Sequence, residues 1–328
     1  MKILFIRFSS IGDIVLTTPV IRCVKNQLKD VEIHFLVRKS YHEVLEHNPY
    51  IDKIFLFDNN LEEVIPALKK EKYDLIIDLQ KNIRSLRIRM ALGARSHTFN
   101  KLNVRKYLLV NFRINLLPDI HIVDRYMKAV ESLGIINDGL GLDYFISQAD
   151  EGAVHRLPRS HQQDYIAWVI GARHRTKRLP PEKMISIAEK IKSPIVILGN
   201  AADYADGEGL LKHSSAKIHN SCGNFSLNES AAIVKRAKLI ITHDTGLMHV
   251  AAAFRKNIIS LWGNTIPEFG MYPYKGNSDA ANKVRDFQST ILEVELNCRP
   301  CSKIGFDKCP KGHFRCMRDI DETVFEDL

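Results

Sequence analysis

Short apolar runs alternate with longer stretches whose apolar side chains recur every three or four positions along most of the chain. The short runs predict buried strands, and the periodic stretches predict amphipathic helices. Strands that alternate with helices are typical of parallel α/β sheets. In the first half of the chain the pattern predicts strands at residues 2–8, 31–37, 53–57 and 74–79 and helices at 14–28, 41–47, 61–70, 83–92 and 121–133.

The pattern weakens between Gly139 and Gln163, where Gly, Ser, Pro and charged residues mix without a period. We expect the connection between two domains in this stretch and predict domains at residues 1–155 and 156–328. The alternation then resumes, with strands at 165–170, 195–199, 216–218, 239–242 and 258–263 and helices that begin near 180, 203, 226 and 245. The predicted fold class is therefore α/β, with two consecutive open parallel sheets.

Composition narrows the classes of protein. The chain of 328 residues is 45% hydrophobic and 26% charged, which is typical of a soluble globular protein, and it has no apolar run of the roughly 20 residues that a membrane span needs. The first residues turn polar too early for a signal peptide, so we expect a cytoplasmic protein. The formal net charge of +9 indicates an anionic partner: nucleic acid, an anionic lipid surface or a phosphorylated substrate.

The segment 243–253 follows one predicted strand and precedes another, so it should form a tight turn and a helix. Asp244, Thr245 and Gly246 at the turn can cap the helix and leave its first amides open to a phosphate, which the helix dipole also favours. The small residues after His249 would let the helix lie close to the sheet. We therefore predict that a nucleotide-linked donor binds here.

Three other strand ends carry candidate residues. Asp13 follows the first strand and is either a helix cap or a carboxylate placed to act as a general base. Thr176 and Lys177 follow the strand at 165–170 and could hold a diphosphate, or belong to a solvated basic loop. Asp203 follows the strand at 195–199 and suits either ribose hydroxyls or a helix N-cap. The turn before Asp13 lacks the first two glycines of a dinucleotide fingerprint, which weakens a dehydrogenase interpretation.

A basic run follows the strand predicted at 74–79, within the first predicted domain. Lys81, Arg84 and Arg87 are spaced three apart and could share a helix face, which suits an anionic acceptor or a solvated surface. The run has few interleaved aromatic residues, which argues against stacking on single-stranded nucleic acid.

Four of the six cysteines cluster near the C-terminal end: Cys298, Cys301, Cys309 and Cys316. A CxxC pair followed by two further thiols can form a tetrahedral zinc site, and four thiolates would make that site structural. Reduced thiols and disulfides are the alternatives.

With these residues in view, the chain resembles the ADP-heptose:lipopolysaccharide heptosyltransferases of glycosyltransferase family 9. Its first motif is residues 6–19, IRFSSIGDIVLTTP, and its last is residues 244–249, DTGLMH. Between them lie DLQ at 78–80 with Arg84, DRY at 124–126 and TKRLP at 176–180, in the family's order. The resemblance extends over nearly the whole chain to about residue 263.

The resemblance implies a GT-B fold, in which two Rossmann-like domains face each other across a cleft, with the acceptor domain first and the nucleotide-sugar domain second. It implies an inverting, metal-independent transfer of heptose from ADP-heptose to an inner-core lipopolysaccharide sugar, with no cofactor required for catalysis. Asp13 matches the general base, and Gln80 and Arg84 match the acceptor side. The donor side matches Thr176, Lys177, Asp203, Asp244, Thr245, Gly246 and His249.

Such an enzyme would meet its acceptor in peripheral contact with the cytoplasmic face of the inner membrane, whose anionic surface suits a basic protein. Two other classes stay open. One is a GT-B enzyme that uses a different nucleotide sugar, either a transferase or an epimerase. The other is a basic nucleic-acid-binding protein, which would leave the Asp13 and Asp244 turns without a role.

Overall fold

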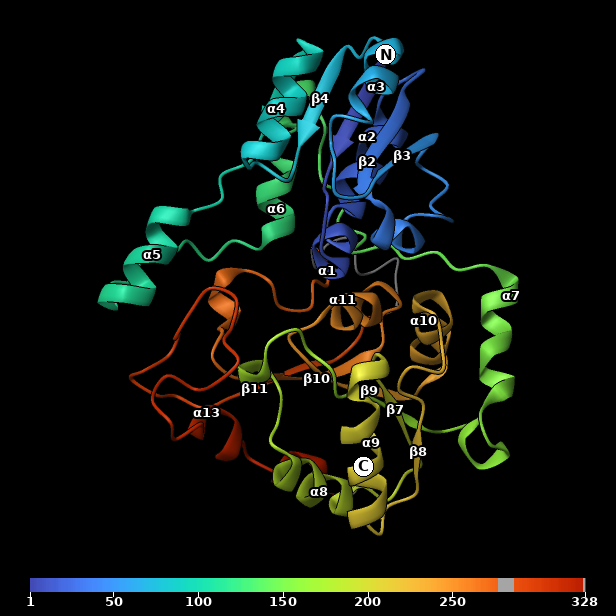
Figure 1. Cartoon of the computed structure of the whole chain (residues 1–328), viewed down its shortest axis with the longest axis vertical. Coiled ribbons are helices and arrows are strands. Elements are labelled where there is room, and N and C mark those ends of the chain that lie inside the picture. Colours follow the sequence, from blue (N-terminus) through green and yellow to red (C-terminus); the bar gives the residue numbers. More distant parts are fainter. Residues whose placement is uncertain (277–285, 327) are drawn as a thin grey trace. The chain divides into compact units, whose positions relative to one another are not determined.

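The computed structural model describes residues 1–276, 286–326 and 328. The chain divides into two compact units, which are described separately here (Figure 1). Unit 1 comprises residues 1–102, 120–145 and 274–285, and unit 2 comprises 103–119, 146–273 and 286–328. Compact units of this kind do not establish where an independently folding domain ends, so a domain boundary at residue 155 stays a prediction.

Unit 1 contains a five-stranded parallel sheet in the order β3-β2-β1-β4-β5. Its central strands are nearly continuous apolar runs that are buried along almost their whole length, as in sheets covered on both faces. The strands are β1 (Lys2–Ile6), β2 (Glu32–Arg38), β3 (Lys53–Phe57), β4 (Leu75–Asp78) and β5 (Arg95–Thr98). The helices are α1 (Ile11–Val15), α2 (Thr18–Gln27), α3 (Ile65–Glu71), α4 (Ile83–Leu92) and α6 (Ile122–Met127), with 3₁₀ turns at Lys39–Val44 and Glu131–Leu133.

Unit 2 contains a six-stranded parallel sheet in the order β11-β10-β9-β6-β7-β8. A large apolar core that includes Trp168 packs against this sheet. The strands are β6 (Ile166–Val169), β7 (Ile195–Leu198), β8 (Ile218–Asn220), β9 (Leu239–His243), β10 (Asn257–Trp262) and β11 (Ser289–Glu293). The helices are α5 (Asn103–Phe112), α7 (Gln148–Glu151), α8 (Pro181–Lys190), α9 (Tyr204–His213), α10 (Leu227–Arg236), α11 (Gly246–Ala253) and α13 (Arg315–Arg318). The 3₁₀ turns are Gly152–Arg156, Arg159–His161, Arg175–Lys177, Ala201–Asp203, Pro267–Phe269 and Thr323–Phe325.

The predicted α/β class with two parallel sheets is confirmed, and three helix predictions need correction. The helix expected at 41–47 is the 3₁₀ segment Lys39–Val44. The helix expected at 14–28 is two helices, and α2 begins so that Pro19 lies in its first turn, where the missing N–H of proline is tolerated. The helix expected at 121–133 ends at Met127, and the chain continues as a 3₁₀ turn that Gly134 closes in the left-handed conformation.

The described residues include no helix with the length and hydropathy needed to cross a bilayer.

Candidate functional site

Each sheet has one switch point, where the chain leaves two neighbouring parallel strands toward opposite edges of the sheet. In unit 1 this switch point lies between β1 and β4, and in unit 2 it lies between β6 and β9. Open α/β sheets bind ligands beyond the carboxyl ends of the strands at such a point. The chain places Asp13 and Gln80 after β1 and β4, and Lys177 and Asp244 after β6 and β9. These four predicted residues therefore follow strands at the two switch points, whereas Asp203 follows the neighbouring strand β7.

Asp13 lies in the first turn of α1, and both of its carboxylate oxygens are held. Arg7 Nη2 is 2.6 Å from Oδ1, and Ser10 donates to Oδ2 through its hydroxyl at 2.8 Å and its backbone N–H at 3.2 Å. Arg7 is itself fixed, because its guanidinium donates to the backbone oxygens of Ser9 and Leu79. The Asp13 side chain stays 22% exposed, so it caps α1 and still meets solvent.

The electrostatics keep the Asp13 carboxylate ionised. Burial acts to raise the pKa of Asp13, but the Arg7 charge and the hydrogen bonds from Ser10 outweigh it, and the pKa lies below its usual 3.8. A base must be deprotonated before it can accept a proton. Asp13 meets this condition at neutral pH.

Gln80 and Arg84 lie near the end of β1 through contacts with Phe8. The Phe8 N–H donates to Gln80 Oε1 at 2.9 Å, and the Arg84 guanidinium lies 5.9 Å from the centroid of the Phe8 ring. Fully buried Asp78 holds this turn by accepting bonds from the Gln80 N–H and the Ser85 hydroxyl. Arg84 is exposed, so its charge is available to an anionic group.

The prediction that Lys81 shares a helix face with Arg84 and Arg87 is wrong. Lys81 precedes the N-cap residue Asn82, has a positive φ of 46°, and its ammonium group donates to the backbone oxygen of Phe99. Asp78 accepts the Lys81 N–H, which stabilises a turn at this position in place of a first helical turn.

In unit 2, Lys177 and Asp244 form an ion pair that links the loop after β6 to the turn after β9. Thr265 donates its hydroxyl to the same Asp244 oxygen at 3.0 Å. The Lys177 side chain is 16% exposed, and an ammonium group in such surroundings keeps donors for a phosphate oxygen. Asp244 thus fixes the position of the cation.

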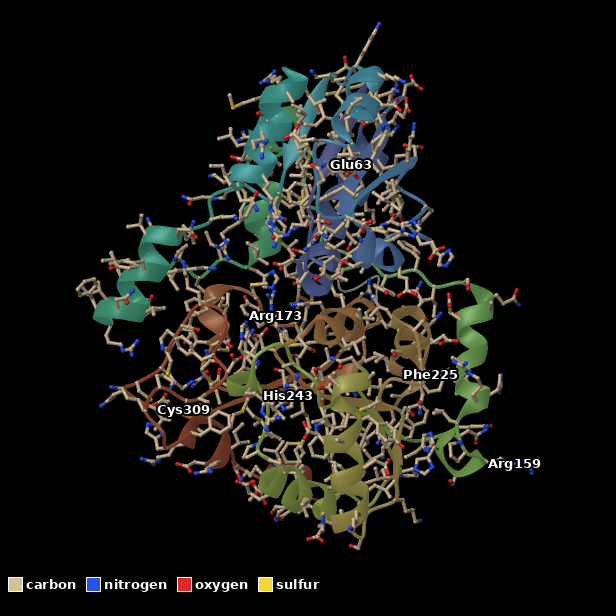
Figure 2. All side chains as sticks on the ribbon, viewed as in Figure 1. Glu63, Arg159, Arg173, Phe225, His243 and Cys309 are labelled. Carbon is tan, nitrogen blue, oxygen red and sulfur yellow. The ribbon has the colours of Figure 1, made fainter. Side chains whose placement is uncertain are left out.

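The helix that follows Asp244 supplies backbone donors. Thr245 is the N-cap of α11, Gly246 is its first residue, and the Thr245 side chain makes no capping hydrogen bond. His249 is buried on the same helix at 2% exposure. His243, labelled in Figure 2, accepts a bond from the Leu179 N–H at 3.0 Å, and burial lowers its pKa to about 3. Neutral His243 therefore ties the loop after β6 to the end of β9.

Thr176 and Asp203 are buried and already bonded. Thr176 exchanges two hydrogen bonds with the backbone of Phe306 and is 2% exposed. Asp203 is 1% exposed, accepts a bond from Arg178 Nη1 at 2.6 Å, and caps the 3₁₀ turn at Ala201–Asp203 by accepting from the Asn200 N–H. These positions favour support of the loop over direct contact with a ligand, which makes the predicted ribose contact of Asp203 less direct than expected.

The four C-terminal cysteines are free thiols in the structure. Burial and the neighbouring Cys298 and Cys309 together raise the pKa of Cys301 to about 11. Cys298 Sγ lies 3.7 Å from His313 Nε2. Cys309, labelled in Figure 2, belongs to the same C-terminal segment. Within the described part of the chain, no three of these sulfurs lie within 4.8 Å of one another.

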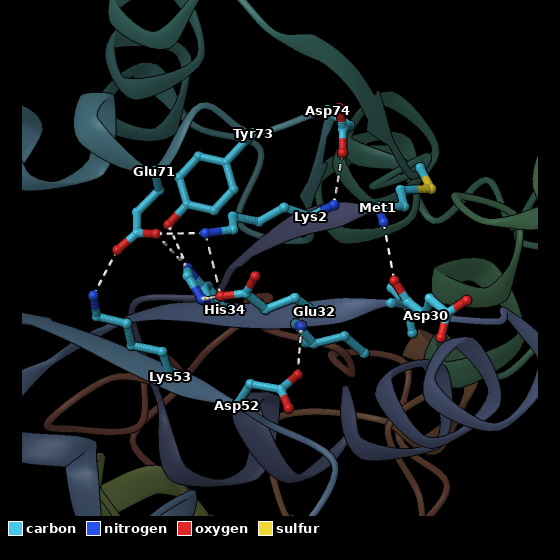
Figure 3. Close-up of polar contacts among 12 residues, drawn as sticks. Met1, Lys2, Asp30, Glu32, His34, Asp52, Lys53, Glu71, Tyr73 and Asp74 are labelled. Atoms are coloured by element: carbon cyan, nitrogen blue, oxygen red, sulfur yellow. Dashed lines mark hydrogen bonds and ion pairs between the residues drawn. The ribbon is translucent and has the colours of Figure 1, made fainter.

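A second group of residues of the types that bind metal ions lies where the strands of the unit 1 sheet begin, at the end away from Asp13 (Figure 3). Glu32, His34 and Glu71 each offer an atom within 4.8 Å of the other two. Lys2 bonds to Glu71 at 2.7 Å and lies 3.2 Å from Glu32, and Lys53 bonds to Glu71 at 2.5 Å. Two ammonium groups already neutralise the carboxylates, so this cluster stabilises the sheet edge and is a poor cation site.

The sequence interpretation did not single out Arg7, Thr265 or Arg178 as parts of the site. Each is the partner of a predicted residue: Arg7 of Asp13, Thr265 of Asp244, and Arg178 of Asp203. Arg7 and Thr265 follow β1 and β10 within a few residues, so the strand-end rule that selected the other candidates could have found them.

Two open parallel sheets with polar groups at both switch points are the architecture of a GT-B glycosyltransferase. Residues 62–297 match the sequence model of glycosyltransferase family 9 (heptosyltransferase). The match covers well over half of the chain, and the chain belongs to this family. It is a glycosyltransferase, as the sequence predicted.

Similar proteins agree with this assignment. Lipopolysaccharide heptosyltransferase 1 of Campylobacter coli is 24% identical over 292 residues, which cover 81% of this chain and 84% of that protein. A glycosyltransferase family 9 structure from Veillonella parvula has a TM-score of 0.73 at 23% identity and covers 89% of this chain and 86% of its own. The structure of Escherichia coli ADP-heptose LPS heptosyltransferase II has a TM-score of 0.72 at 18% identity, with 97% and 98% coverage. These structures confirm the fold.

Proposed function

We propose that this glycosyltransferase moves heptose from ADP-heptose to an inner-core sugar of lipopolysaccharide. The observation that carries the proposal is the ion pair of Lys177 with Asp244 at the start of α11, at the switch point of the unit 2 sheet. A fixed cation beside a helix N-terminus is suited to a diphosphate. The names of the relatives support heptose and lipopolysaccharide as the substrates.

On the donor side, Lys177 and the first amides of α11 bind the diphosphate, with Thr245 and Gly246 forming the turn. Asp244 and Thr265 hold Lys177 in place. Buried His249 packs α11 against the sheet, and Thr176 fixes the loop that carries Lys177. Asp203, which follows β7, acts through Arg178 of the loop after β6, with which it forms an ion pair.

Asp13 is the general base of the proposed reaction. It removes the proton of the acceptor hydroxyl while that oxygen forms a bond to the anomeric carbon. The bond from this carbon to the ADP oxygen breaks on the opposite side, and ADP leaves with the electron pair, so the configuration inverts. Lys177 and the α11 amides stabilise the charge that develops on the leaving diphosphate. The Lys177 ammonium group and the α11 amides therefore support a transfer that needs no metal ion or cofactor.

Gln80 and Arg84 are the proposed acceptor side. Gln80 is fixed to the end of β1 by the Phe8 N–H, and exposed Arg84 can pair with a phosphate on the lipopolysaccharide core. This acceptor is anchored in a membrane, so the proposal includes peripheral contact with the cytoplasmic face of the inner membrane.

A donor screen tests the proposal. Purified protein is incubated with truncated lipopolysaccharide and, in parallel, with ADP-heptose or other ADP- and UDP-sugars, and the acceptor mass is measured. We expect a mass gain of one heptose with ADP-heptose alone. Transfer from a different nucleotide sugar would move the chain to another GT-B activity, and a changed donor without any acceptor product would indicate an epimerase.

We also propose that Cys298, Cys301, Cys309 and Cys316 hold a structural zinc ion. The CxxC spacing, the preference of zinc for sulfur and the 3.7 Å distance from Cys298 to His313 support this. Zinc binding would have to bring the thiols together, because no three of the described sulfurs lie within 4.8 Å of one another. Metal analysis of protein purified without added zinc should find about one zinc per chain. Absence of zinc with six titratable thiols would indicate free cysteines, and absence of zinc with fewer thiols would indicate disulfides.

A further inference from the structure

The positive charge of the chain is concentrated in one tract. Between Asp78 and Asp119 there is no acidic residue, while residues 79–118 contain nine Lys and Arg residues, as many as the formal net charge of +9. In the rest of the chain the acidic and basic residues are equal in number. The nine basic residues of the tract 79–118 are Lys81, Arg84, Arg87, Arg89, Arg95, Lys101, Arg105, Lys106 and Arg113.

Helix α5 (Figure 1) lies in this tract. It carries an exposed apolar stripe. Val104, Tyr107 and Phe112 are 73%, 54% and 60% exposed. Val104 lies one turn before Tyr107, and the Tyr107 and Phe112 rings are in contact with their centroids 6.0 Å apart, so the three side chains form one exposed apolar group. Large apolar side chains grouped on one exposed face mark an interaction surface.

The other side of α5 is packed. Leu109 is 6% exposed and forms a small core with Ile266 and Phe269, and the Lys106 ammonium group lies 5.3 Å from the centroid of the Phe269 ring. These contacts hold the helix on unit 2. The exposed stripe is therefore presented by a fixed helix and is additional to the face that the core uses.

The chain after α5 also carries exposed apolar side chains next to a basic residue. Ile114 and Leu116 are 48% and 53% exposed, between them lies Asn115, and Arg113 anchors the segment by donating to the backbone oxygens of Pro300 and Cys298. Exposed Arg105 lies beside the apolar stripe. Apolar side chains are thus held outward among cations, with no carboxylate in the tract.

We propose that residues 104–116 dock on an anionic phospholipid bilayer. Val104, Tyr107, Phe112, Ile114 and Leu116 enter the boundary between headgroups and acyl chains, and the neighbouring cations meet the lipid phosphates. Interfacial helices combine an apolar face with neighbouring cations. The apolar face gains affinity from its burial in the bilayer, and the cations gain affinity from anionic lipid. The inference deepens the proposed function, on which it rests, because it names the surface that meets the membrane of the acceptor.

Charge and apolarity together select the bilayer over two other occupants. A second copy of the chain would present the same positive tract, so the two surfaces would repel. A nucleic acid would pair with the cations but would leave the apolar stripe in water. An anionic bilayer matches both features.

Helix α4 repeats the pattern in unit 1. Ile83, Leu86 and Met90 are 77%, 41% and 74% exposed at spacings of three and seven residues, and exposed Arg84 and Arg87 lie between them. Both helices of the acid-free tract thus carry an exposed apolar stripe with cations beside it.

The test is sedimentation of the full chain with vesicles of phosphatidylcholine alone or of phosphatidylcholine with phosphatidylglycerol. We expect binding to the anionic vesicles that weakens as salt rises, and a loss of about tenfold or more in the Val104→Ser/Tyr107→Ser/Phe112→Ser variant. Arg105→Glu should weaken binding to the same vesicles. Ile136→Ser/Leu211→Ser, which removes exposed apolar side chains elsewhere, is the control and should bind like the wild type.

Two results would overturn the inference: no wild-type binding to anionic vesicles, or equal binding by the triple variant. Loss of concentration-dependent dimers in the triple variant, without vesicle binding by the wild type, would assign the stripe to a second copy. A measurement of heptose transfer to an acceptor solubilised in detergent, without vesicles, separates this inference from the proposed function. The triple variant should keep that activity, whereas an incorrect function would leave the wild type inactive even if it bound vesicles.

Discussion

At the scale of single residues, Arg7 sets the protonation state of Asp13. Arg7 is 8% exposed, and its guanidinium lies 2.6 Å from the carboxylate and counteracts the burial that would otherwise raise the pKa of Asp13. The same contact directs the carboxylate, which Ser10 holds on its other oxygen. Arg7 is thus a positioning residue for the proposed base.

Replacing Arg7 with Met should move the acid limb of kcat/KM to higher pH. In the wild type the pKa of Asp13 lies below 3.8, so the carboxylate stays ionised throughout the usual assay range. Without the cation, burial raises the pKa, the carboxylate becomes protonated as the pH falls, and activity at pH 5 should drop relative to pH 8. Arg7→Lys, which keeps the charge, should change the profile less; identical profiles for Arg7→Met and the wild type would contradict this role.

Lys177→Met should weaken donor binding. A charge-assisted hydrogen bond is worth about 2 kcal/mol, so the dissociation constant of ADP-heptose should rise about thirtyfold in calorimetry. Lys190→Met removes a lysine at the end of α8 that pairs with Glu326, and it serves as the control with wild-type affinity. Wild-type donor affinity in Lys177→Met would remove Lys177 from the donor site.

The sequence predicted the positions of the candidate residues better than their surroundings. Strand ends identified Asp13, Lys177 and Asp244, because the carboxyl edge of a parallel sheet is where ligands bind. The burial of Thr176 and Asp203 depends on partners far along the chain, Phe306 and Arg178. Contacts of this kind have no local signal in the sequence.

At the scale of elements, the prediction was accurate where the local sequence pattern is regular. The strand at 53–57 and the helix at 83–92 have the predicted bounds, and α10 begins beside residue 226 as expected, with a capping box of Ser226 and Glu229. The edge strands β5 and β11 were missed, because neither has a buried apolar run. Helix α5 was also missed, since its apolar residues face both the core and the solvent and hide the helical period.

The edge where β1, β2 and β3 begin should lose stability in acid. Hydrogen bonds from Lys2 and Lys53 lower the pKa of Glu71 to about 2 from its ordinary 4.5. A carboxylate whose pKa is lowered by folding stabilises the protein above its unfolded pKa and loses this effect as the pH falls through the folded value. The contribution of Glu71 should therefore be complete above about pH 4.5 and decline toward pH 2.

Urea unfolding of Glu71→Gln measures this contribution. At pH 7 we expect a loss of about 1 kcal/mol, since the ion pairs are partly exposed, and the difference from the wild type should shrink below pH 4.5. Glu62→Gln, whose partner Arg87 is largely exposed, should change stability by less than about 0.5 kcal/mol. A difference for Glu71→Gln that is constant from pH 7 to pH 3 would contradict the assignment.

At the scale of the whole molecule, the proposed account divides the chemistry between the two units. Unit 1 carries the carboxylate that accepts a proton, and unit 2 carries the cation and helix N-terminus that hold the leaving group. Each sheet places its contribution at its own switch point. The sequence indicated this division because the strand–helix alternation stops and restarts once along the chain.

The most direct test measures ADP release and acceptor mass in one reaction with ADP-heptose and truncated lipopolysaccharide, for the wild type and Asp13→Asn. The account predicts one ADP released for each heptose added by the wild type. For folded Asp13→Asn it predicts a rate lower by about 10²- to 10⁴-fold with donor affinity retained. ADP release without a heavier acceptor, or near-native transfer by Asp13→Asn, would contradict the account.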